Sequence, residues 1–402
     1  MDICYVSHCV PWPPDKGERI RAFNSVNQLV RRHRVHVACL ARDPKEAHAD
    51  SELRRRCASV HVEVLNAPRA FARALVRFAS GRCFSTAFYW NPALDRHIRK
   101  VAADCPIAAV ILLSSGMAVY APEAIPFIAD WGDVDSEKWL QYSRTRFPGF
   151  LYAAESRRVR KTECEYAFRS RRAFFTTPNE LNLFREIAPE APAGCAGNGV
   201  DFEFFDPRLP FNLANLRNRQ FLVFVGVLNY FPNSDGVCRF AETVFPELRR
   251  RNPQLELFLV GRNPAENVLR LASKPGITVT GTVADVRPYL AAARGVIAPL
   301  QIARGIQNKV LEALAMGKTV LASKQVCATF APQLPAGIVP CESVESYVRS
   351  VEALPSPASS NANIRDAAQA RFSWSENLAP IMAELDAIEQ SGKRPRVTGA
   401  WI

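Results

Sequence analysis

Two charged side chains, Lys309 and Glu312, stand three residues apart in the segment 304–323. This segment predicts a glycine-led helix start, a short amphipathic helix and a buried strand, and the spacing places both side chains on one helix face. The first amides of such a helix bind anions, and Lys309 adds a full positive charge beside them. A carboxylate one turn further in can accept hydrogen bonds from two adjacent hydroxyls. Phosphate at the helix tip and a diol one turn down outline a sugar nucleotide. The alternative is an ordinary amphipathic helix whose charged residues face solvent.

Apolar runs alternate with amphipathic helical patterns along the whole chain, as in repeated strand–helix units. The runs form two series, at residues 3–6, 35–40, 60–65, 108–113, 126–129 and 173–177, and then at 221–226, 255–261, 277–280, 295–300 and 319–323. Helical patterns lie between them at 19–32, 92–103, 234–251 and 284–293. Continuous apolar strands joined by helices predict parallel sheets covered on both faces, so two series predict two doubly wound domains.

The break between the two series falls near residues 189–220, where Pro, Gly and Asn cluster and no periodicity survives. Ligands of such sheets bind beyond the carboxyl ends of the strands. In a chain with two of them, the cleft between the domains is the expected site. The residues from Ser391 onward predict a loose tail.

Composition places the chain among ordinary globular proteins, with 402 residues, 48% hydrophobic and 22% charged. No apolar run reaches the ~18 residues that span a bilayer. The first residues lead straight into a strand pattern, without the features of a signal peptide. Eleven scattered cysteines show no metal-binding spacing, so we expect reduced, mostly buried thiols. These features together favour the cytoplasm.

The net charge of +12 is unevenly distributed, because residues 1–195 hold 29 Lys and Arg against 21 Asp and Glu. Nucleic acid, acidic lipid and a phosphorylated substrate all suit such an excess. No nucleic-acid motif is present, so no nucleic-acid partner is expected. Arg69, Arg73 and Arg77 form a basic stripe beside the apolar residues Phe71, Leu75 and Phe78. This helix either packs its apolar face on the core or lies on a membrane surface near a lipid-linked acceptor.

Six segments, each at a strand end, together resemble a known family. They are residues 7–21, 130–139, 197–201, 224–233, 280–287 and 304–323. The chain resembles the GT-B-fold glycosyltransferases of the large family 4 type, and within them the bacterial sugar transferases associated with exosortase and exopolysaccharide gene clusters. The resemblance extends over nearly the whole chain.

The resemblance implies an α/β GT-B fold, with two doubly wound, Rossmann-like parallel-sheet domains facing across a cleft. The expected domains are an acceptor-side domain at 1–195, a nucleotide-sugar domain at 196–375, and a C-terminal helix with the tail at 376–402 that packs back on the first domain. The implied activity moves a sugar from a nucleotide diphosphate sugar to a saccharide or lipid-linked saccharide, with retention and without a metal or other cofactor. The composition favours the cytoplasm, and the charge excess of the N-terminal half with the Arg69–Arg77 stripe gives peripheral contact at the inner face of an anionic cytoplasmic membrane as a second expectation.

The implied site residues fall into three groups. Those expected to take part in catalysis are Asp130, Asp133, Lys309 and Glu312. Those expected to bind the nucleotide sugar are Gly17, Gly226, Asn233, Val283, Ile306, Gln307, Asn308, Lys309 and Glu312. Those expected on the acceptor side are Lys16, Arg19, Arg21, Ser136 and Lys138. For Asn233 the alternative is a cap on a helix that begins at Ser234.

The chain departs from the family pattern at two places. Relatives carry an Arg and a Lys that grip the pyrophosphate where this chain has residues 227–231, which shifts that role to Lys309, the helix tip, and Arg304 or Arg262. The first member of the family's acidic pair is replaced by Arg304, which could pair with a phosphate or a sugar carboxylate. An acidic donor such as a uronic acid is therefore permitted.

Asp133 and Asp135 also match the DxD signature with which another glycosyltransferase fold holds a divalent cation. That fold has one nucleotide domain, whereas two series are present here, so we expect cleft-facing acceptor residues and no metal. A sugar-nucleotide epimerase of the same architecture and a non-catalytic nucleotide-sugar-binding protein remain alternatives. The sequence names neither the donor sugar and base, nor the acceptor and linkage, nor the oligomeric state.

Overall fold

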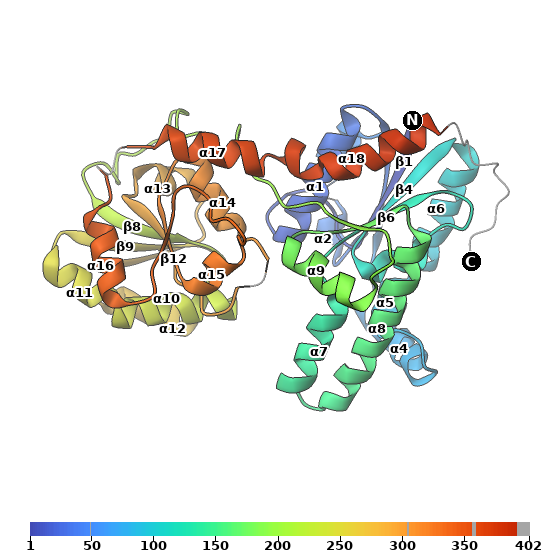
Figure 1. Ribbon diagram of the computed structural model, residues 1–402, viewed down its shortest axis with the longest axis horizontal. Coiled ribbons are helices and arrows are strands. Elements are labelled where there is room, and N and C mark those ends of the chain that lie inside the picture. Colours follow the sequence, from blue (N-terminus) through green and yellow to red (C-terminus); the bar gives the residue numbers. More distant parts are fainter. Residues whose placement is uncertain (49, 304, 356–358, 392–402) are drawn as a thin grey trace. The chain divides into compact units, whose positions relative to one another are not determined.

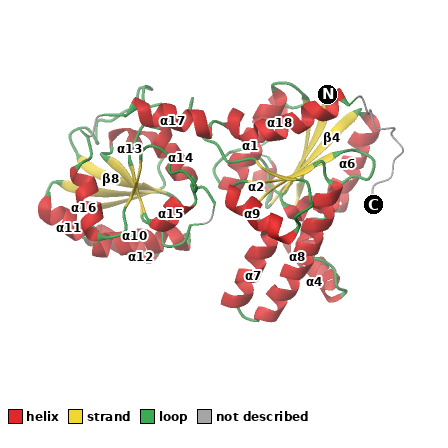
Figure 2. Ribbon diagram, viewed as in Figure 1, coloured by secondary structure: helices red, strands yellow, loops and turns green. Residues whose placement is uncertain are grey.

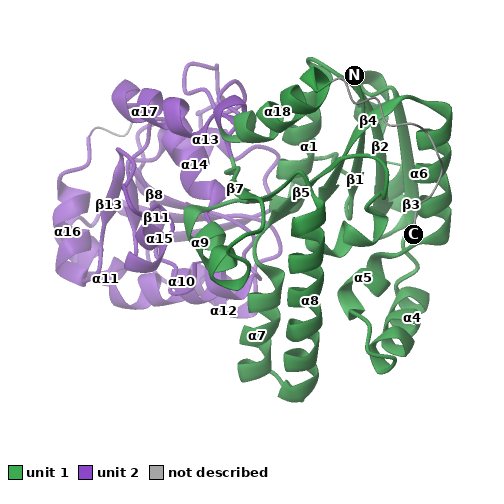
Figure 3. Ribbon diagram, turned by 45° about the vertical axis from the view of Figure 1, so that its right-hand side comes forward, with its two compact units in different colours: residues 1–198, 377–402 green, residues 199–376 purple. Residues whose placement is uncertain are grey.

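The computed structural model describes residues 1–48, 50–303, 305–355 and 359–391 (Figure 1). The predicted roles of Arg304 and of the tail after Ser391 therefore fall outside the described residues. The chain forms two compact units, residues 1–198 with 377–402, and residues 199–376 (Figure 3). Each unit is a parallel sheet with helices on both faces (Figure 2). The predicted α/β class, with two Rossmann-like parallel-sheet domains, is confirmed.

The first sheet has seven strands in the order β3-β2-β1-β4-β5-β6-β7. Their bounds are β1 Asp2–Ser7, β2 Arg34–Ala41, β3 Ser59–Val64, β4 Ile107–Leu113, β5 Phe127–Gly132, β6 Arg172–Phe175 and β7 Ala193–Cys195. Strands β1 and β4 are buried along almost their whole length, which explains their continuous apolar sequences. Strand β7 lies inside the segment predicted to lack regular structure, because three residues are too few to show a period.

The helices of the first unit connect these strands and cover both faces of the sheet. They are α1 Gly17–Val30, α2 Pro44–Ala47, α3 Ser51–Arg56, α4 Ala67–Ala79, α5 Phe84–Tyr89, α6 Pro92–Asp104, the 3-10 helix η1 Ser115–Tyr120, α7 Asp135–Thr145, α8 Gly149–Arg169 and α9 Pro178–Ile187. Helix α18, Trp374–Gln390, crosses from the second unit to the first. Beyond Asn377 it pairs Glu384 with Arg172 and Asp386 with Arg32.

The second sheet has six strands in the order β10-β9-β8-β11-β12-β13. Their bounds are β8 Gln220–Val225, β9 Leu255–Val260, β10 Ile277–Gly281, β11 Gly295–Ala298, β12 Val320–Ala322 and β13 Ile338–Pro340. The helices are α10 Phe231–Thr243, α11 Phe245–Arg251, α12 Glu266–Leu269, the 3-10 helix η2 Arg270–Ser273, α13 Arg287–Ala292, α14 Asn308–Ala315, α15 Lys324–Ala328, α16 Val344–Glu352 and α17 Ala362–Phe372.

Two expectations about this sheet are corrected. The continuous helix predicted at 234–251 is two helices that meet at Val244, because Pro246 lacks an amide hydrogen and starts a new helix at its first turn. Strand β13 has no counterpart among the predicted strands, because its three residues end in Pro340 and resemble a loop in sequence.

The segment that joins the units is held by two buried arginines, one on each side. Arg21 of the first unit donates to the carbonyls of Ala196 at 3.0 Å and Gly197 at 3.1 Å. Arg365 of the second unit donates to the carbonyl of Phe202 at 2.7 Å. Of the helices that the structure describes, none combines the length and the apolar composition needed to cross a lipid bilayer.

Candidate functional site

The second sheet brings three predicted residues into contact beyond the carboxyl end of β8. The Nζ of Lys309 on α14 donates to Asn233 Oδ1 at 2.6 Å, and Asn233 Nδ2 donates to the carbonyl of Val227 at 2.8 Å. A Cβ on Gly226 would lie 3.0 Å from Asn233 Nδ2 and 3.4 Å from Lys309 Cε. The absence of a side chain at Gly226 therefore provides the space in which the Asn233 amide contacts the Lys309 ammonium.

Asn233 does not cap a helix, so that alternative is wrong. Helix α10 begins at Phe231, with Tyr230 at its N-cap position, and Asn233 lies within the first turn. The side chain is buried and bridges the loop after β8 to Lys309. It positions the ammonium by accepting one of its hydrogen bonds.

Lys309 and Glu312 lie on the half-buried side of α14, whose other residues from Val310 to Ala315 are buried in the core. Burial lowers the pKa of Lys309 to about 8, and burial raises the pKa of Glu312 to about 7. Among the described residues no donor lies within hydrogen-bond distance of the Glu312 carboxylate. The alternative of two solvated surface charges is therefore wrong. Both groups are held where desolvation penalises their charged forms, which a charged or polar ligand would offset.

The start of α14 suits an anion. Gln307 stands at the N-cap and makes no side-chain bond to the amides of the first turn. The positive end of the helix dipole lies in the turn from which Lys309 extends. Ile306, Gln307 and Asn308, all expected to bind the nucleotide sugar, are half-buried in this same turn.

The neighbouring strand ends bring backbone close to the same edge of the sheet. A Cβ on Gly261, which follows β9, would lie 1.6 Å from the carbonyl oxygen of Gly226, so only glycine fits. Arg262 follows it, and its carbonyl accepts from the amide of Leu228 at 3.0 Å. Val283 follows β10, is half-buried and packs partly on the core. All the predicted nucleotide-sugar residues except Gly17 thus gather on the second unit.

The predicted acceptor residues of the first unit are less accessible than expected. Gly17 begins α1 and is exposed, and Lys16 before it lies 3.9 Å from Glu46. Arg19 is buried and pairs with Asp15 at 3.1 Å and with Glu46. The expectation that Arg19 faces an acceptor does not fit this position, because the side chain is buried and its two terminal nitrogens pair with Asp15 and Glu46.

Asp130 and Arg21 form a buried ion pair. Arg21 Nε donates to both carboxylate oxygens of Asp130 at 3.0 Å, and its Nη2 donates to Oδ1 at 2.5 Å. Asp130 has no exposed surface, and Arg21 is 5% exposed. The expected catalytic role of Asp130 and the expected acceptor role of Arg21 do not fit this geometry. The pair instead anchors the carbonyls of Ala196 and Gly197, and both residues are positioning groups.

The segment that contains the DxD signature has both exposed and buried residues. Asp133 is exposed and accepts from Thr176 Oγ1 at 3.3 Å, while Asp135 accepts from Ser115 Oγ and lies 3.8 Å from Lys138 Nζ. Ser136 is fully buried, so its expected acceptor role is wrong. Within the described ranges, no group of three or more His, Cys, Asp or Glu side chains gathers that could hold a metal ion.

A polar cluster at the carboxyl edge of the first sheet was missed. His8 follows β1, and its Nε2 lies 3.4 Å from Glu18 Oε2. Arg42, which follows β2, donates to Glu18 Oε1 at 2.6 Å, and the ring of Tyr89 meets His8 edge-on at 5.7 Å. The hydrogen bond with His8 lowers the pKa of Glu18 to about 2. The sequence signal for this cluster is a histidine directly after the first apolar run.

Comparison with known proteins agrees with this division of the chain. Residues 219–355, which lie within the second unit, match the family model described as Glycosyl transferases group 1. The match spans β8 to α16 and includes Lys309 and Glu312. No curated protein sequence matches the chain significantly.

Solved structures resemble the whole chain in fold. The Anabaena protein HepE in complex with UDP is 15% identical with a TM-score of 0.67, covering 96% of this chain and 100% of that one. Sucrose-phosphate synthase from Thermosynechococcus elongatus is 14% identical with a TM-score of 0.69, covering 98% and 100%. A glycosyltransferase from Rickettsia africae is 12% identical with a TM-score of 0.65, covering 97% and 99%. At these identities the likeness is one of fold, and the fold is GT-B.

Proposed function

We propose that this chain is a glycosyltransferase that moves a sugar from a nucleoside diphosphate sugar to a saccharide or lipid-linked saccharide acceptor. The observation that carries the proposal is the Lys309–Asn233 contact with Glu312 beside it, at the start of α14. It supports binding of a diphosphate and a diol by one helix, and it lies within the segment that matches the glycosyl transferase domain.

On the donor side, the leaving group is a nucleoside diphosphate on which negative charge develops as the glycosidic bond breaks. The Lys309 ammonium and the first amides of α14 would stabilise that charge, which is electrostatic catalysis by groups already in place. Glu312 would accept hydrogen bonds from the ribose diol. The HepE structures hold UDP or UDP-glucose, which makes a uridine nucleotide the first donor to test.

On the acceptor side, we assign the role expected of Arg19, Arg21 and Ser136 to the cluster of His8, Glu18 and Arg42. Glu18 holds the imidazole and the guanidinium at the carboxyl edge of the first sheet, where a hydroxyl of the acceptor could bond to His8. Asp133 and Lys138 are the accessible members of the original assignment.

The chemistry we propose retains the anomeric configuration and uses no metal. The leaving phosphate would take the proton from the acceptor hydroxyl, so no dedicated base is required. The positive charge at the start of α14 would replace the cation that a diphosphate otherwise recruits. A cytoplasmic location and a part in exopolysaccharide synthesis belong to the same proposal.

The test is nucleotide recognition followed by turnover. Thermal stabilisation should be measured with UDP, GDP, ADP, UMP and uridine. We expect one diphosphate to stabilise the protein more than its monophosphate and nucleoside, and the matching nucleotide sugar to be consumed with an acceptor. Conversion of the nucleotide sugar without an acceptor would identify an epimerase instead. Binding without any turnover or hydrolysis would identify a non-catalytic binder.

A further inference from the structure

The first unit exposes apolar side chains in two places. One is the tip of the hairpin formed by α7 and α8, where Phe147 is 96% exposed and Phe150 is 71% exposed. The other is α4, where Phe71, Leu75 and Val76 are 55%, 53% and 70% exposed. Together with Leu151 at the hairpin tip, these side chains form what we call the apolar face. Single exposed apolar residues are normal, but a grouped set marks an interaction surface.

Helix α4 buries its small residues and exposes its large apolar residues. Its buried residues are the small Ala70 and Ala74, while Phe71, Leu75 and Val76 point to solvent. The alternative in which Phe71 and Leu75 pack on the core is therefore wrong. A helix that buries alanine and exposes phenylalanine needs a partner for its outer face.

Direct contacts join the two parts of the apolar face. Glu155 on α8 accepts from the amides of Phe84 at 2.9 Å and Ser85 at 2.8 Å, at the start of α5. Arg158 on α8 donates to the carbonyl of Phe78 at 2.7 Å and stacks on its ring at 4.0 Å. Figures 1 and 3 show α4 and the hairpin projecting from the same side of the first unit.

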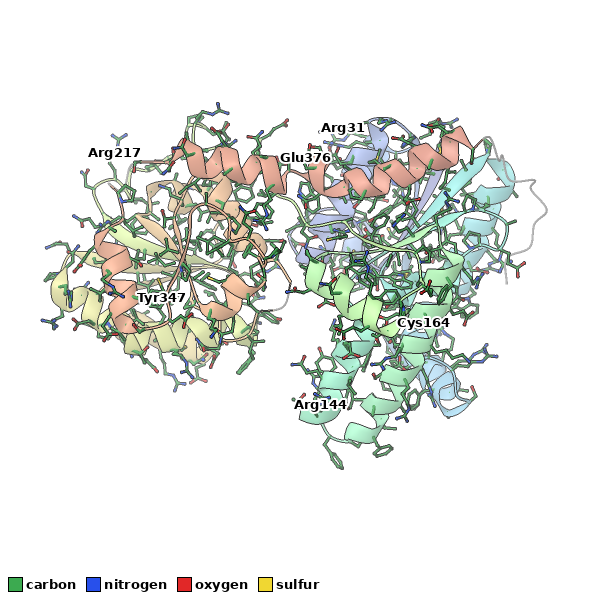
Figure 4. All side chains as sticks on the ribbon, in the orientation of Figure 1. Arg31, Arg144, Cys164, Arg217, Tyr347 and Glu376 are labelled. Carbon is green, nitrogen blue, oxygen red and sulfur yellow. The ribbon has the colours of Figure 1, made fainter. Side chains whose placement is uncertain are left out.

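The two segments that carry the apolar face contain basic residues and no acidic residue. Residues 64–94 contain four arginines and no Asp or Glu, and residues 138–154 contain Lys138, Arg144, Arg146 and no Asp or Glu. Arg144 and Arg146 are exposed, and Arg144 lies near the free end of the hairpin (Figure 4). Arg73 does not contribute, because it bonds to the carbonyl of Ala87 and stacks on a tryptophan ring.

We propose that the apolar face docks on an anionic phospholipid bilayer, with Phe147 and Phe150 inserted at the headgroup boundary. Aromatic side chains favour that boundary, and arginines beside them reach the lipid phosphates. Charge complementarity selects this occupant over a second copy of the chain, because two faces of like charge repel. Two separate elements projecting from one side also suit an extended surface.

The position of the face adds a functional consequence. Helix α4 follows β3 and helix α7 follows β5, so both rise from the carboxyl edge that carries His8, and Asp135 is the first residue of α7. A bilayer on this face would present a lipid-linked acceptor to that edge. This consequence rests on the proposed function, whereas the docking itself does not.

The test is co-sedimentation with vesicles of equal parts phosphatidylglycerol and phosphatidylcholine, against vesicles of phosphatidylcholine alone. We expect binding to the anionic vesicles at about 0.1 M salt and little at about 1 M, because the screening length falls from ~10 Å to ~3 Å. R144Q/R146Q should lower the partition coefficient by about fivefold for each arginine. F147S/F150S should lower it at either salt concentration.

The controls remove comparable groups elsewhere. F168S changes a phenylalanine that is 56% exposed on the same helix α8, and R31Q/R217Q removes two exposed arginines, one from each unit. Both controls should sediment as the wild type does. In F147W, brominated lipids should quench fluorescence beyond the quenching seen in wild type, which reports insertion directly.

Three results would overturn the proposal. The first is wild-type protein that ignores anionic vesicles at low salt. The second is an equal loss in F168S and F147S/F150S. The third is a self-association, measured by analytical ultracentrifugation, that F147S/F150S abolishes, which would make a second copy the occupant. Nucleotide binding measured on the same preparations keeps a failure of docking distinct from a failure of the proposed function.

Discussion

At the carboxyl edge of the first sheet, Arg21 donates to both oxygens of Asp130 at 3.0 Å, and the pair is sealed from solvent. At the carboxyl edge of the second sheet, Lys309 donates to the neutral amide oxygen of Asn233, and Glu312 has no hydrogen-bond donor among the described residues. Both edges contain charged groups of opposite sign. They differ in whether the protein itself satisfies those charges.

This difference distinguishes charges that stabilise the fold from charges that are able to bind a ligand. A buried charge that is fully paired keeps the backbone around it in place, and it has nothing left to offer a ligand. A half-buried charge whose pKa moves toward neutrality is held at a free-energy cost that ligand binding recovers. Under the proposed function, the donor side would be preformed on α14, and the acceptor side would depend on His8 and Glu18 rather than on the buried arginines.

The largest expected effect comes from breaking the Arg21–Asp130 pair. We expect R21A and D130A each to lower the free energy of unfolding by about 3–5 kcal/mol, because each leaves a buried charge without its partner. Urea denaturation would measure this loss. The double variant R21M/D130L should recover only part of it, since no unpaired charge remains but the carbonyls of Ala196 and Gly197 lose their donor.

Nucleotide affinity decides whether Asp130 is more than a positioning residue. If folded D130N binds nucleotide like the wild type but has lost transfer, then the catalytic role assigned from the sequence would be restored.

The second largest effect is expected at Lys309, on the carboxyl edge of the second sheet, and Lys318 serves as a comparison. We expect K309A to lower transfer by about 10²–10³-fold, since it removes an electrostatic partner of the leaving group. Its diphosphate affinity should fall more than its nucleoside affinity. Calorimetry with UDP and uridine would measure this. The loss of stability should be small, because removing Lys309 leaves the Asn233 amide oxygen without this donor but also removes a desolvated charge.

Lys318 is the matched control. Burial lowers its pKa to about 8 as well, but its Nζ donates to the carbonyls of Ala291 at 2.8 Å and Ala293 at 3.1 Å. K318A should therefore lose stability, by about 1–3 kcal/mol for the carbonyls left unpaired, and keep nucleotide affinity while folded. Equal nucleotide affinity in wild type and K309A would refute the donor assignment.

A smaller effect is expected at the acceptor edge. H8Q should lower transfer by about 10²-fold if the imidazole positions the acceptor hydroxyl, while the affinity for UDP and the hydrolysis of the donor stay unchanged. E18Q should show the same pattern to a lesser degree, because it loosens the His8 ring without removing it. Steady-state kinetics with donor and acceptor varied separately would distinguish the two halves. A parallel loss of donor affinity in H8Q would contradict the division between the edges.

The two shifted groups of the donor edge also predict a pH profile. Lys309 must be protonated to hold phosphate, so affinity should fall as the pH rises through its pKa of about 8. Glu312 must be ionised to accept from a diol, so affinity should fall as the pH drops through its pKa of about 7. Each limb should change affinity by at most about tenfold per pH unit.

Two variants assign the limbs of that profile. K309R keeps its charge and should flatten the alkaline limb, and E312Q should flatten the acid limb, because a neutral amide does not titrate. The nucleotide's own phosphate titrates identically in all of them. A profile that is unchanged in both variants would show that neither group meets the ligand.

The fold could be predicted from sequence because continuous apolar strands and helix periods are local signals. Lys309 and Glu312 could be picked out for the same reason, since a spacing of three residues fixes a shared face. Local sequence patterns do not show which residue pairs with a given charged side chain. Asp130 and Arg21 are more than a hundred positions apart, and only the packed sheet shows that they saturate each other. The contact of Asn233 with Lys309, and the outward face of α4, depend on packing in the same way.

The smallest expected effect is that of metal removal. We expect transfer to be unchanged by a chelator, because the Lys309 ammonium and the α14 dipole supply positive charge where a diphosphate would lie. In the first unit Asp133 and Asp135 match a cation-binding signature, but the two carboxylates have different partners, Thr176 for one and Ser115 for the other. Activity should be measured after dialysis against a chelator and again after addition of magnesium or manganese, with D133N as a control. Loss of activity in chelator that is restored by either cation in wild type, but not in D133N, would make these aspartates metal ligands and would move the charge that stabilises the leaving group from the second unit to the first.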